Sequence, residues 1–396
     1  MASRRRIKRK MKKLWWILLP FILLFVLLVL FLKFNYHPKN VDNSKSTVEE
    51  KEEVKVPKVY EAKVFMVGDA LIHSGVYLDA LQSDGSYDFK PMLQYIKPIV
   101  SKYDLKYYNQ ETILGGKELG YSNYPRFNSP NEVGDAFLDA GFNLVSLATN
   151  HTMDKGEAGV INSVNYWKSK ENVVSSGQWT SYEDRDQVRI YDINGISYAF
   201  FSYTTWTNGL ETPAGKEYLN NVYSPEKAAN DIAKVRDLAD VIIVAMHWGT
   251  EYSLNVSQQQ TEIANYLSSL GVNLIIGAHP HVVEPVEYIN DGKTFVIYSL
   301  GNFISAQVGI ERLTGLMMEV TIKKVVDIDD SVTISIEEPK ADLTYTHTDN
   351  YKNFRVYPYS KLDNVILPNY MNYYEYYKGI VSSRYPELIW GLSGEW

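Results

Sequence analysis

The chain of 396 residues contains no cysteine. A disulfide, a thiolate metal ligand and a cysteine nucleophile are therefore excluded, and any chemistry must rest on other side chains. Histidine is also scarce, with seven residues in the whole sequence. Two of the seven, His279 and His281, flank a single proline at the end of an apolar run, which makes this segment a candidate for a functional site.

Basic residues dominate only the start of the chain. Residues 1–34 carry nine Lys or Arg and no acidic residue, and subtracting these nine positive charges from the formal net charge of −7 leaves −16 on residues 35–396. Phosphate contacts need a basic face, so this acidic remainder argues against a nucleic-acid partner. Hydrophobic residues make up 45% of the sequence and charged residues 22%, which is typical of a globular protein.

One long apolar run lies near the N-terminus. Residues 1–13 hold eight basic residues, and residues 14–32 are 19 uncharged, mostly apolar residues, enough to span the roughly 30 Å hydrocarbon core of a bilayer as a helix. We expect a single-pass anchor in the cell membrane, with a cytoplasmic basic tail and an extracellular main domain. A cleaved signal peptide is the alternative, but no small-residue cleavage site follows the run.

The rest of the chain divides by composition. Residues 33–61 are polar and charged with almost no apolar periodicity, which favours a flexible stalk. We expect the main domain at 62–340 and a Tyr-rich C-terminal extension at 341–396, in which residues 370–385 are compatible with a packing helix.

Alternating strand and helix signals predict an α/β domain with mixed sheets. Short β-rich apolar runs alternate with helix-like segments at 131–141, 224–239 and 257–271. Asn194-Gly195 and Asp291-Gly292 are strong hairpin signals, and a further hairpin is expected over 317–338.

Polar residues recur just past the predicted strands, where ligands bind in open α/β sheets. His279 and His281 are expected on one side of an extended segment that Pro280 maintains, since residues i and i+2 of such a segment point the same way. A single histidine or aspartate at a strand end is usually a surface or turn residue, so the hypothesis rests on their joint occurrence. Imidazoles, carboxylates and an amide oxygen suit a divalent metal ion, with Mn, Fe or Zn favoured over Mg. The residues concerned are Asp69, Glu111, Asn150, His151, His247, His279 and His281.

Six motifs resemble, in order, those of the CapA-type poly-γ-glutamate capsule biosynthesis proteins (PGA_cap domain), which are related to calcineurin-like metallophosphoesterases. The motifs are GDALIH, YNQET, LATNHTMDKG, MHWGTEY, GAHPHVVEP and YSLGNF, and the resemblance covers about residues 63–305. The resemblance implies a four-layer α/β/β/α metallophosphoesterase-like sandwich around a two-metal centre.

The resemblance also implies roles for individual residues. His151 is similar to the histidine that assists the leaving group, and the implied metal ligands are Asp69, Glu111, Asn150, His247, His279 and His281. The sequence departs from the wider superfamily at two points: the opening Asp-x-His is reduced to Asp69, and Glu111 replaces a bridging aspartate. His73 either compensates as a ligand or caps the following helix.

Further residues are expected beside the ligands, where they orient imidazoles or contact substrate. They are His73, Asn109, Asp154, Glu251 and Asn302. For Asp154 and Glu251, a solvated loop position is the alternative.

Three functions follow as hypotheses. The resemblance implies biosynthesis or export of a poly-γ-glutamate capsule, with the anionic polymer and membrane subunits of a polyglutamate ligase or exporter as partners. The alternative is an outward-facing metal-dependent hydrolase of cell-envelope phosphoesters. The third is an envelope scaffold whose metal site is degenerate, which the reduced first motif supports.

Overall fold

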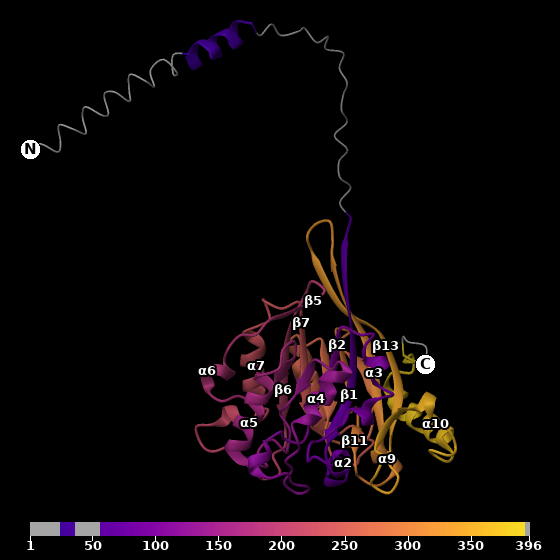
Figure 1. The fold of residues 1–396 in the computed structure, drawn as a ribbon. Helices are drawn as coiled ribbons and strands as arrows, with labels where there is room; N and C mark the ends of the chain where they lie inside the picture. Colours follow the sequence, from indigo (N-terminus) through magenta and orange to yellow (C-terminus); the bar gives the residue numbers. More distant parts are fainter. Residues whose placement is uncertain (1–23, 36–55, 393–396) are drawn as a thin grey trace, which may run out of the picture. The chain divides into compact units, whose positions relative to one another are not determined.

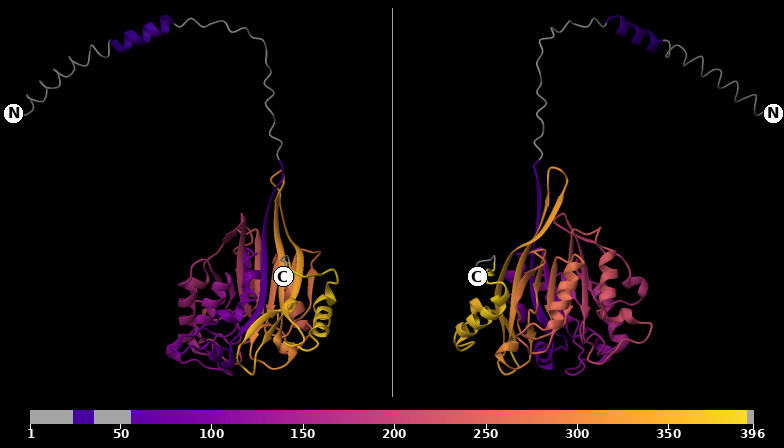
Figure 2. Two further views of the ribbon diagram at one scale, coloured as in Figure 1. Left: turned by 45° about the vertical axis from the view of Figure 1, so that its right-hand side comes forward. Right: turned by 180° about the vertical axis from the view of Figure 1, so that it is seen from behind.

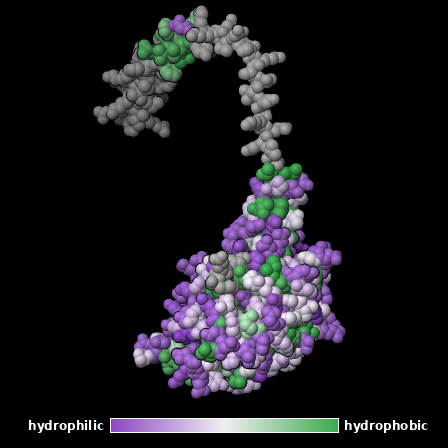
Figure 3. Space-filling model, turned by 90° about the vertical axis from the view of Figure 1, so that its right-hand side faces the viewer, coloured by the Kyte–Doolittle hydropathy of each residue, from purple (hydrophilic) through white to green (hydrophobic). Residues whose placement is uncertain are grey.

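The computed structural model describes residues 24–35 and 56–392 and divides the chain into two units, Met1–Val54 and Lys55–Trp396. In the first unit, residues 24–34 form a helix whose apolar side chains are exposed (Figure 3). No helix in the described part of the chain combines the length and the apolarity needed to cross a bilayer. The expected anchor at 14–32 is described only from residue 24 onward, and the basic tail at 1–13 lies outside the described residues.

The larger sheet of the second unit is built around β1. Its strands lie in the order β14-β13-β12-β1-β2-β3-β4, with β11 pairing with β1 and β15 with β13. The sheet is mixed, because β1 is parallel to β2 and antiparallel to β12. The strands are β1 (Lys58–Leu71), β2 (Leu105–Asn109), β3 (Leu144–Ser146), β4 (Val174–Ser176), β11 (Asn302–Ser305), β12 (Thr314–Val326), β13 (Val332–His347), β14 (Arg355–Pro358) and β15 (Ile389–Trp390).

The second sheet has the order β5-β6-β7-β8-β10-β9. Its four inner strands are parallel, and the two edge strands β5 and β9 are antiparallel to their neighbours. Every residue of β7 and β8 is buried, as expected of parallel strands covered on both faces. The strands are β5 (Tyr191–Ile193), β6 (Ile196–Thr204), β7 (Val241–His247), β8 (Leu274–Ala278), β9 (Val286–Ile289) and β10 (Thr294–Ile297).

Helices connect the strands and cover the sheets. The α-helices are α2 (Ser74–Ala80), α3 (Lys97–Val100), α4 (Glu132–Ala140), α5 (Gly156–Lys168), α6 (Tyr182–Arg185), α7 (Pro225–Ala233), α8 (Gln258–Ser269), α9 (Ile310–Leu313) and α10 (Tyr370–Val381). The short 3-10 turns are η1 (Lys90–Leu93), η2 (Lys117–Leu119), η3 (Glu217–Leu219), η4 (Tyr359–Lys361) and η5 (Ser382–Arg384).

The side chains of β1 define the layers of this unit. Val64 and Met66 lie in a core shared with the second sheet, whereas Phe65 and Val67 pack toward α4 and α5. This alternation is the period of two that a strand imposes. The outer face of the second sheet packs against α7 and α8, for example through Ile232. Two sheets therefore lie face to face with helices on both outer surfaces, an α/β/β/α order (Figures 1 and 2).

The three expected helices are confirmed, with shifted ends. α4 ends before Gly141, which takes a left-handed φ of 107°. α8 begins after Ser257, whose side chain forms a capping box with Gln260. α7 begins after Ser224 but ends at Ala233, short of the expected end at residue 239.

The expected hairpins are also confirmed. β5 and β6 turn at Asn194-Gly195, where both residues have positive φ, and β9 and β10 are joined through Asp291-Gly292. The third hairpin consists of β12 and β13, whose strands continue well beyond the predicted range. β1 begins at Lys58, four residues before the expected start of the domain at residue 62.

Residues 341–392 belong to the same compact unit as the two sheets. β13 runs through the expected boundary at residue 340, and β14 and β15 both pair with it. The expected helix within 370–385 is confirmed as α10, which lies at the yellow end of the ribbon (Figure 2). Tyr377 and Val381 of α10 pack into the core.

A close approach of two backbone segments fixes the end of β1. A Cβ atom at Gly68 would lie 1.8 Å from the carbonyl oxygen of Gly301, so a larger residue does not fit there without a backbone shift. The next residue, Asp69, donates its N–H to that carbonyl at 2.9 Å and lies opposite Asn302 of β11. Asp69 is thereby held at the end of the unit where α2, β11 and α9 lie (Figure 1).

Candidate metal centre

The predicted site residues follow the carboxyl ends of strands from both sheets. Asp69 lies near the end of β1, His247 is the last residue of β7, and His279 directly follows β8. All three are buried. The two sheets therefore bring acidic and imidazole side chains from distant parts of the chain to one place.

Glu111 is the central residue of this cluster. It lies two residues beyond β2, and both of its carboxylate oxygens are buried without a hydrogen-bond partner. A buried carboxylate without a donor is costly unless a cation compensates it. The described residues contain two groups suited to hold a metal ion, and Glu111 belongs to both.

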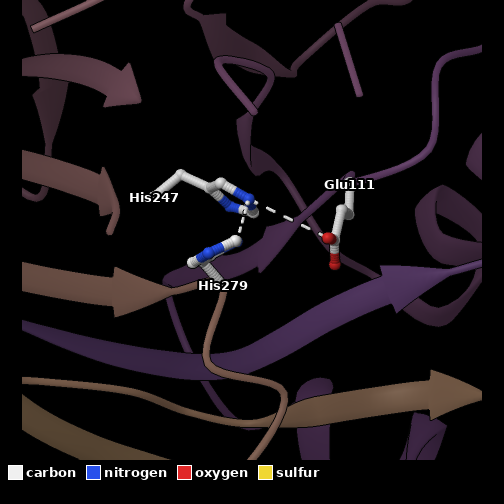
Figure 4. Close-up of side chains that lie close together, drawn as sticks. All are labelled: Glu111, His247 and His279. Carbon is white, nitrogen blue, oxygen red and sulfur yellow. Dashed lines mark hydrogen bonds and ion pairs between the residues drawn. The ribbon is translucent and has the colours of Figure 1, made fainter. Parts of the chain in front are cut away.

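The first group consists of Glu111, His247 and His279 (Figure 4). Nε2 of His247 lies 3.8 Å from Oε1 of Glu111 and 3.2 Å from Nδ1 of His279. The same nitrogen lies 2.9 Å from Oδ1 of Asn150. Four donor atoms of types that bind transition metals therefore converge, as the sequence predicted.

The second group consists of Asp69, Glu111 and His281. Nδ1 of His281 lies 3.5 Å from Oδ2 of Asp69, and Nε2 lies 3.7 Å from Oε1 of Glu111. Nδ1 of His281 is also 3.1 Å from Oδ1 of Asn302. Asn302 therefore fits the predicted place beside a ligand, because a proton held on Nδ1 leaves the Nε2 lone pair free for a cation.

Asn109 orients Asp69. The Nδ2 group of Asn109 donates to Oδ1 of Asp69 at 2.8 Å, and the Oγ hydroxyl of Ser146 donates to Oδ1 of Asn109 at 2.6 Å. Asp69 also lies 3.4 Å from the backbone N–H of His279. These contacts leave Oδ2 of Asp69 directed toward the ring of His281.

The backbone of the His-Pro-His segment differs from the prediction. His279 has φ of 96° and His281 has φ of 61°, both in the left-handed region. The prediction that Pro280 keeps this segment extended is therefore wrong. The two imidazoles nevertheless face one centre, with ring centroids 5.9 Å apart. Strained backbone of this kind persists where surrounding contacts hold it, and it is common at functional sites.

Burial and mutual charge shift the pKa values in the cluster. Burial lowers the pKa of His279 to about 3, assisted by the charge of His281, and it lowers the pKa of His247 well below its usual value. Burial raises the pKa of Glu111 well above its usual value. For His281, burial acts downward, but attraction to Glu111 and Asp69 outweighs it and raises the pKa to about 9. The neutral imidazoles of His247 and His279 and the buried carboxylate of Glu111 are ligand types that suit divalent cations. The proton that the raised pKa of His281 retains would have to leave when a cation binds there.

His151 lies beside the cluster in a hydrogen-bonded pair. Its Nδ1 is 2.7 Å from Oδ2 of Asp154, which also accepts the N–H of Phe127 at 2.6 Å. The Phe127 ring packs edge-on against the imidazole. The contact with Asp154 fixes the orientation of the His151 ring and engages Nδ1 rather than Nε2.

Two predicted neighbours stand further from the ligands. His73 is at the N-cap position of α2, but its side chain makes no capping hydrogen bond. Its Nδ1 is 3.2 Å from the carbonyl of Leu71, and it belongs to neither group of candidate ligands among the described residues. Burial lowers the pKa of His73 to about 4. Glu251 is exposed, and its charge contributes to the raised pKa values of Glu111 and His281.

Sequence reasoning did not find two residues on the outer side of His281, Tyr252 and Arg312. Tyr252 packs against its ring, and Arg312 lies over Tyr252. Tyr252 stands in the His247 motif, which was a usable signal, but Arg312 lies in a segment with no motif.

Comparisons with known proteins agree with the motif assignment. Residues 63–307, more than half of the chain, match the family described as bacterial capsule synthesis protein PGA_cap. The chain is 26% identical over 272 residues to the PGA biosynthesis protein CapA of Bacillus subtilis (strain 168), covering 65% of this chain and 67% of that protein. It is 28% identical over 255 residues to the capsule biosynthesis protein CapA of Bacillus anthracis, covering 61% of this chain and 59% of that protein.

A crystal structure of a phosphatase from Mycoplasma pneumoniae is similar with a TM-score of 0.45 at 14% identity, covering 78% of this chain and 99% of that one. A TM-score this low supports no conclusion about activity. The family match, the two curated relatives and the mixed α/β sheets agree with one another. The chain therefore belongs to the bacterial capsule synthesis protein family, PGA_cap.

Proposed function

We propose that this chain acts in the biosynthesis or export of a poly-γ-glutamate capsule through a centre that binds two divalent cations. Membership of the capsule synthesis family supports the general role. The observation that carries the cation centre is Glu111, whose orphaned carboxylate is shared between two groups of candidate ligands.

The donor set favours a transition metal. Three imidazoles, two carboxylates and one amide oxygen suit Mn, Fe or Zn, whereas Mg prefers an oxygen-rich shell. Asn150, His247 and His279 would complete the shell of one ion with Glu111. Asp69 and His281 would hold the other ion with the same carboxylate.

The proposed location is the outer face of the cell membrane. An apolar run at 14–32 follows eight basic residues, and its described part is helical with exposed apolar side chains. A single-pass anchor with an extracellular domain would allow contact with membrane subunits that make or export the polymer.

The acidic character of residues 35–396 gives the cations a physical role. Net charge of −16 repels a polyglutamate chain, so bulk attraction cannot bring the polymer to the protein. Bound divalent ions would bridge polymer carboxylates to Asp69 and Glu111, turning local repulsion into attraction.

A deletion strain tests this function. We expect loss of surface polyglutamate, restoration by the wild-type chain, and no restoration by Glu111→Gln. Glu226→Gln, the same change at an exposed position of α7, should restore the polymer fully. Surface polymer that persists in the deletion strain would contradict the proposal.

A second candidate function is hydrolysis of cell-envelope phosphoesters, which the His151–Asp154 pair favours. Two bound ions would supply Lewis acidity and an activated water. Asp154 keeps the proton of His151 on Nδ1 in the neutral form. The protonated imidazole would give a proton from Nε2 to the leaving oxygen.

This second function is tested on the metal-loaded full chain with a simple aromatic phosphoester. We expect His151→Asn to lower kcat by about 100-fold or more with bound metal unchanged, because general acid catalysis typically contributes that much. A metal-loaded wild type without any hydrolytic activity would exclude this function and leave the binding role standing.

A further inference from the structure

A stacked pair of side chains, Tyr252 and Arg312, lies directly beside the candidate metal centre. The rings of Tyr252 and His281 have centroids 5.8 Å apart and planes inclined by 32°. The guanidinium carbon of Arg312 lies 4.8 Å from the centroid of the Tyr252 ring. Arginine over an aromatic face is held by cation–π attraction. The three side chains therefore form a row that runs from the candidate ligand His281 through Tyr252 to the guanidinium of Arg312.

The backbone holds Tyr252 firmly in this row. Its φ of 67° is left-handed, an outlier for a bulky residue. Its N–H donates to the carbonyl oxygen of Pro280 at 2.8 Å, which ties it to the segment between the two histidines. Tyr252 is nevertheless 46% exposed, so it forms part of the surface at the site.

Hydrogen bonds connect the same elements from the other side. Asn302, which contacts His281, donates through Nδ2 to the backbone oxygen of Arg312 and to Oε1 of Gln307, both at 2.9 Å. Gln307 in turn donates to the hydroxyl of Tyr252 at 3.3 Å. Arg312 is therefore positioned through its backbone as well as through its stacked side chain.

A ligand of Arg312 would replace the adjacent Glu311 as the partner of the guanidinium. Nε and Nη2 of Arg312 both donate to Oε1 of Glu311, at 3.3 and 3.2 Å, and the two side chains are 33% and 39% exposed. An exposed pair of this kind contributes little and exchanges readily for a better partner. The planar guanidinium matches a carboxylate or a phosphate with two parallel hydrogen bonds.

We propose that Arg312, stacked on Tyr252, is the specificity-determining group that recognises an anionic oxygen group of the ligand bound at the metal centre. The inference rests on the proposed cation centre and adds the chemical class of its ligand. A carboxylate of a γ-glutamyl polymer and a phosphate share this chemistry. The acidic carboxylates Asp69 and Glu111 cannot attract such a group, so the arginine and the bound cations must do so.

Calorimetric titration of the manganese-loaded full chain tests this inference. Inorganic phosphate and a γ-linked glutamate oligomer are titrated separately, so that the two sources of an anionic group are distinguished. We expect Arg312→Gln to weaken binding of the preferred probe about tenfold or more, the loss typical of a charge-assisted pair. Tyr252→Leu should weaken it as well, because the guanidinium loses its support.

Arg236→Gln is the matched control. Arg236 lies beside Gly271, which precedes the first residue of β8. His279 follows the opposite end of that strand, so Arg236 is remote from the candidate metal centre. This variant removes the same charge and should retain wild-type affinity. The manganese content of every variant should equal that of the wild type.

If Arg312→Gln keeps its manganese and binds the preferred probe with wild-type affinity, the inference about Arg312 is overturned and the cation centre is not. A metal-loaded wild type that binds neither probe would also overturn this inference. A wild type that takes up no manganese would instead overturn the cation centre, and the inference with it.

Discussion

Oε1 of Glu111 lies 3.8 Å from Nε2 of His247, and the same oxygen lies 3.7 Å from Nε2 of His281. Neither distance is that of a hydrogen bond. The carboxylate is buried without any donor, at a point reached from both sheets. Such an arrangement is costly in isolation and becomes favourable when cations lie between the carboxylate and the imidazoles.

Glu111→Gln should remove both cations, because its carboxylate serves both groups of ligands. His279→Ala should remove only one, since His279 belongs to a single group. Elemental analysis of the purified full chain measures both outcomes. Glu226→Gln should keep the wild-type metal content, and a Glu111→Gln protein that retains two ions would refute the shared role.

Cation binding should release protons at neutral pH. The pKa of His281 is raised to about 9 and that of Glu111 is raised well above its usual value, so the metal-free pair holds at least one proton at pH 7. A cation must displace that proton, and its affinity should therefore increase from pH 6 to pH 8. Calorimetry in buffers of different ionisation enthalpy counts the protons; zero release at pH 7 would contradict the ligand assignment.

Gly68→Ala should destabilise the fold by about 3 kcal/mol or more, because overpacking against a backbone atom forces a shift of β1 or β11. The added Cβ atom would lie 1.8 Å from the oxygen of Gly301. Gly379→Ala is the control, because nothing lies within 4 Å of its Cβ position in α10. The control should stabilise by up to about 1 kcal/mol. Urea denaturation compares the two, and equal stabilities would disprove the close approach.

Glu284 should make stability fall as pH rises. Burial raises its pKa from 4.5 to about 8, although Gln260 donates to its Oε2 at 2.6 Å and thereby acts in the opposite direction. The folded protein holds this proton more tightly than the unfolded chain, so stability is full below about pH 4.5 and declines up to about pH 8, by at most roughly 5 kcal/mol.

Glu284→Gln removes this titration while keeping an acceptor for Gln260. The free energy of unfolding of the variant should fall less between pH 5 and pH 9 than that of the wild type. Glu226→Gln should follow the wild-type curve. Parallel curves for Glu284→Gln and the wild type would show that Glu284 is ionised in the folded protein at neutral pH.

Sequence reasoning predicted the site where the pattern is local. Asp69, His247 and His279 each follow a buried run of strand-forming residues, and parallel strands carry such positions to the same end of a sheet. The left-handed backbone at His279 and His281 was not predictable in this way. It depends on contacts with remote residues, such as the pairing of Asp69 with the N–H of His279.

The surface beside the centre was missed for a related reason. Tyr252 and Arg312 are 60 residues apart in sequence, and neither lies at the end of a predicted strand. Only the folded chain shows that α9 brings Arg312 over the tyrosine ring. The extent of β13 beyond residue 340 was likewise hidden, because a change of composition does not mark the end of a strand.

One carboxylate, that of Glu111, is expected to hold two cations. Anomalous diffraction from crystals of the manganese-loaded protein would locate both. We expect two peaks on either side of Glu111, one bounded by His247 and His279 and the other by Asp69 and His281. A single peak away from Glu111, or none in manganese-saturated crystals, would contradict this expectation.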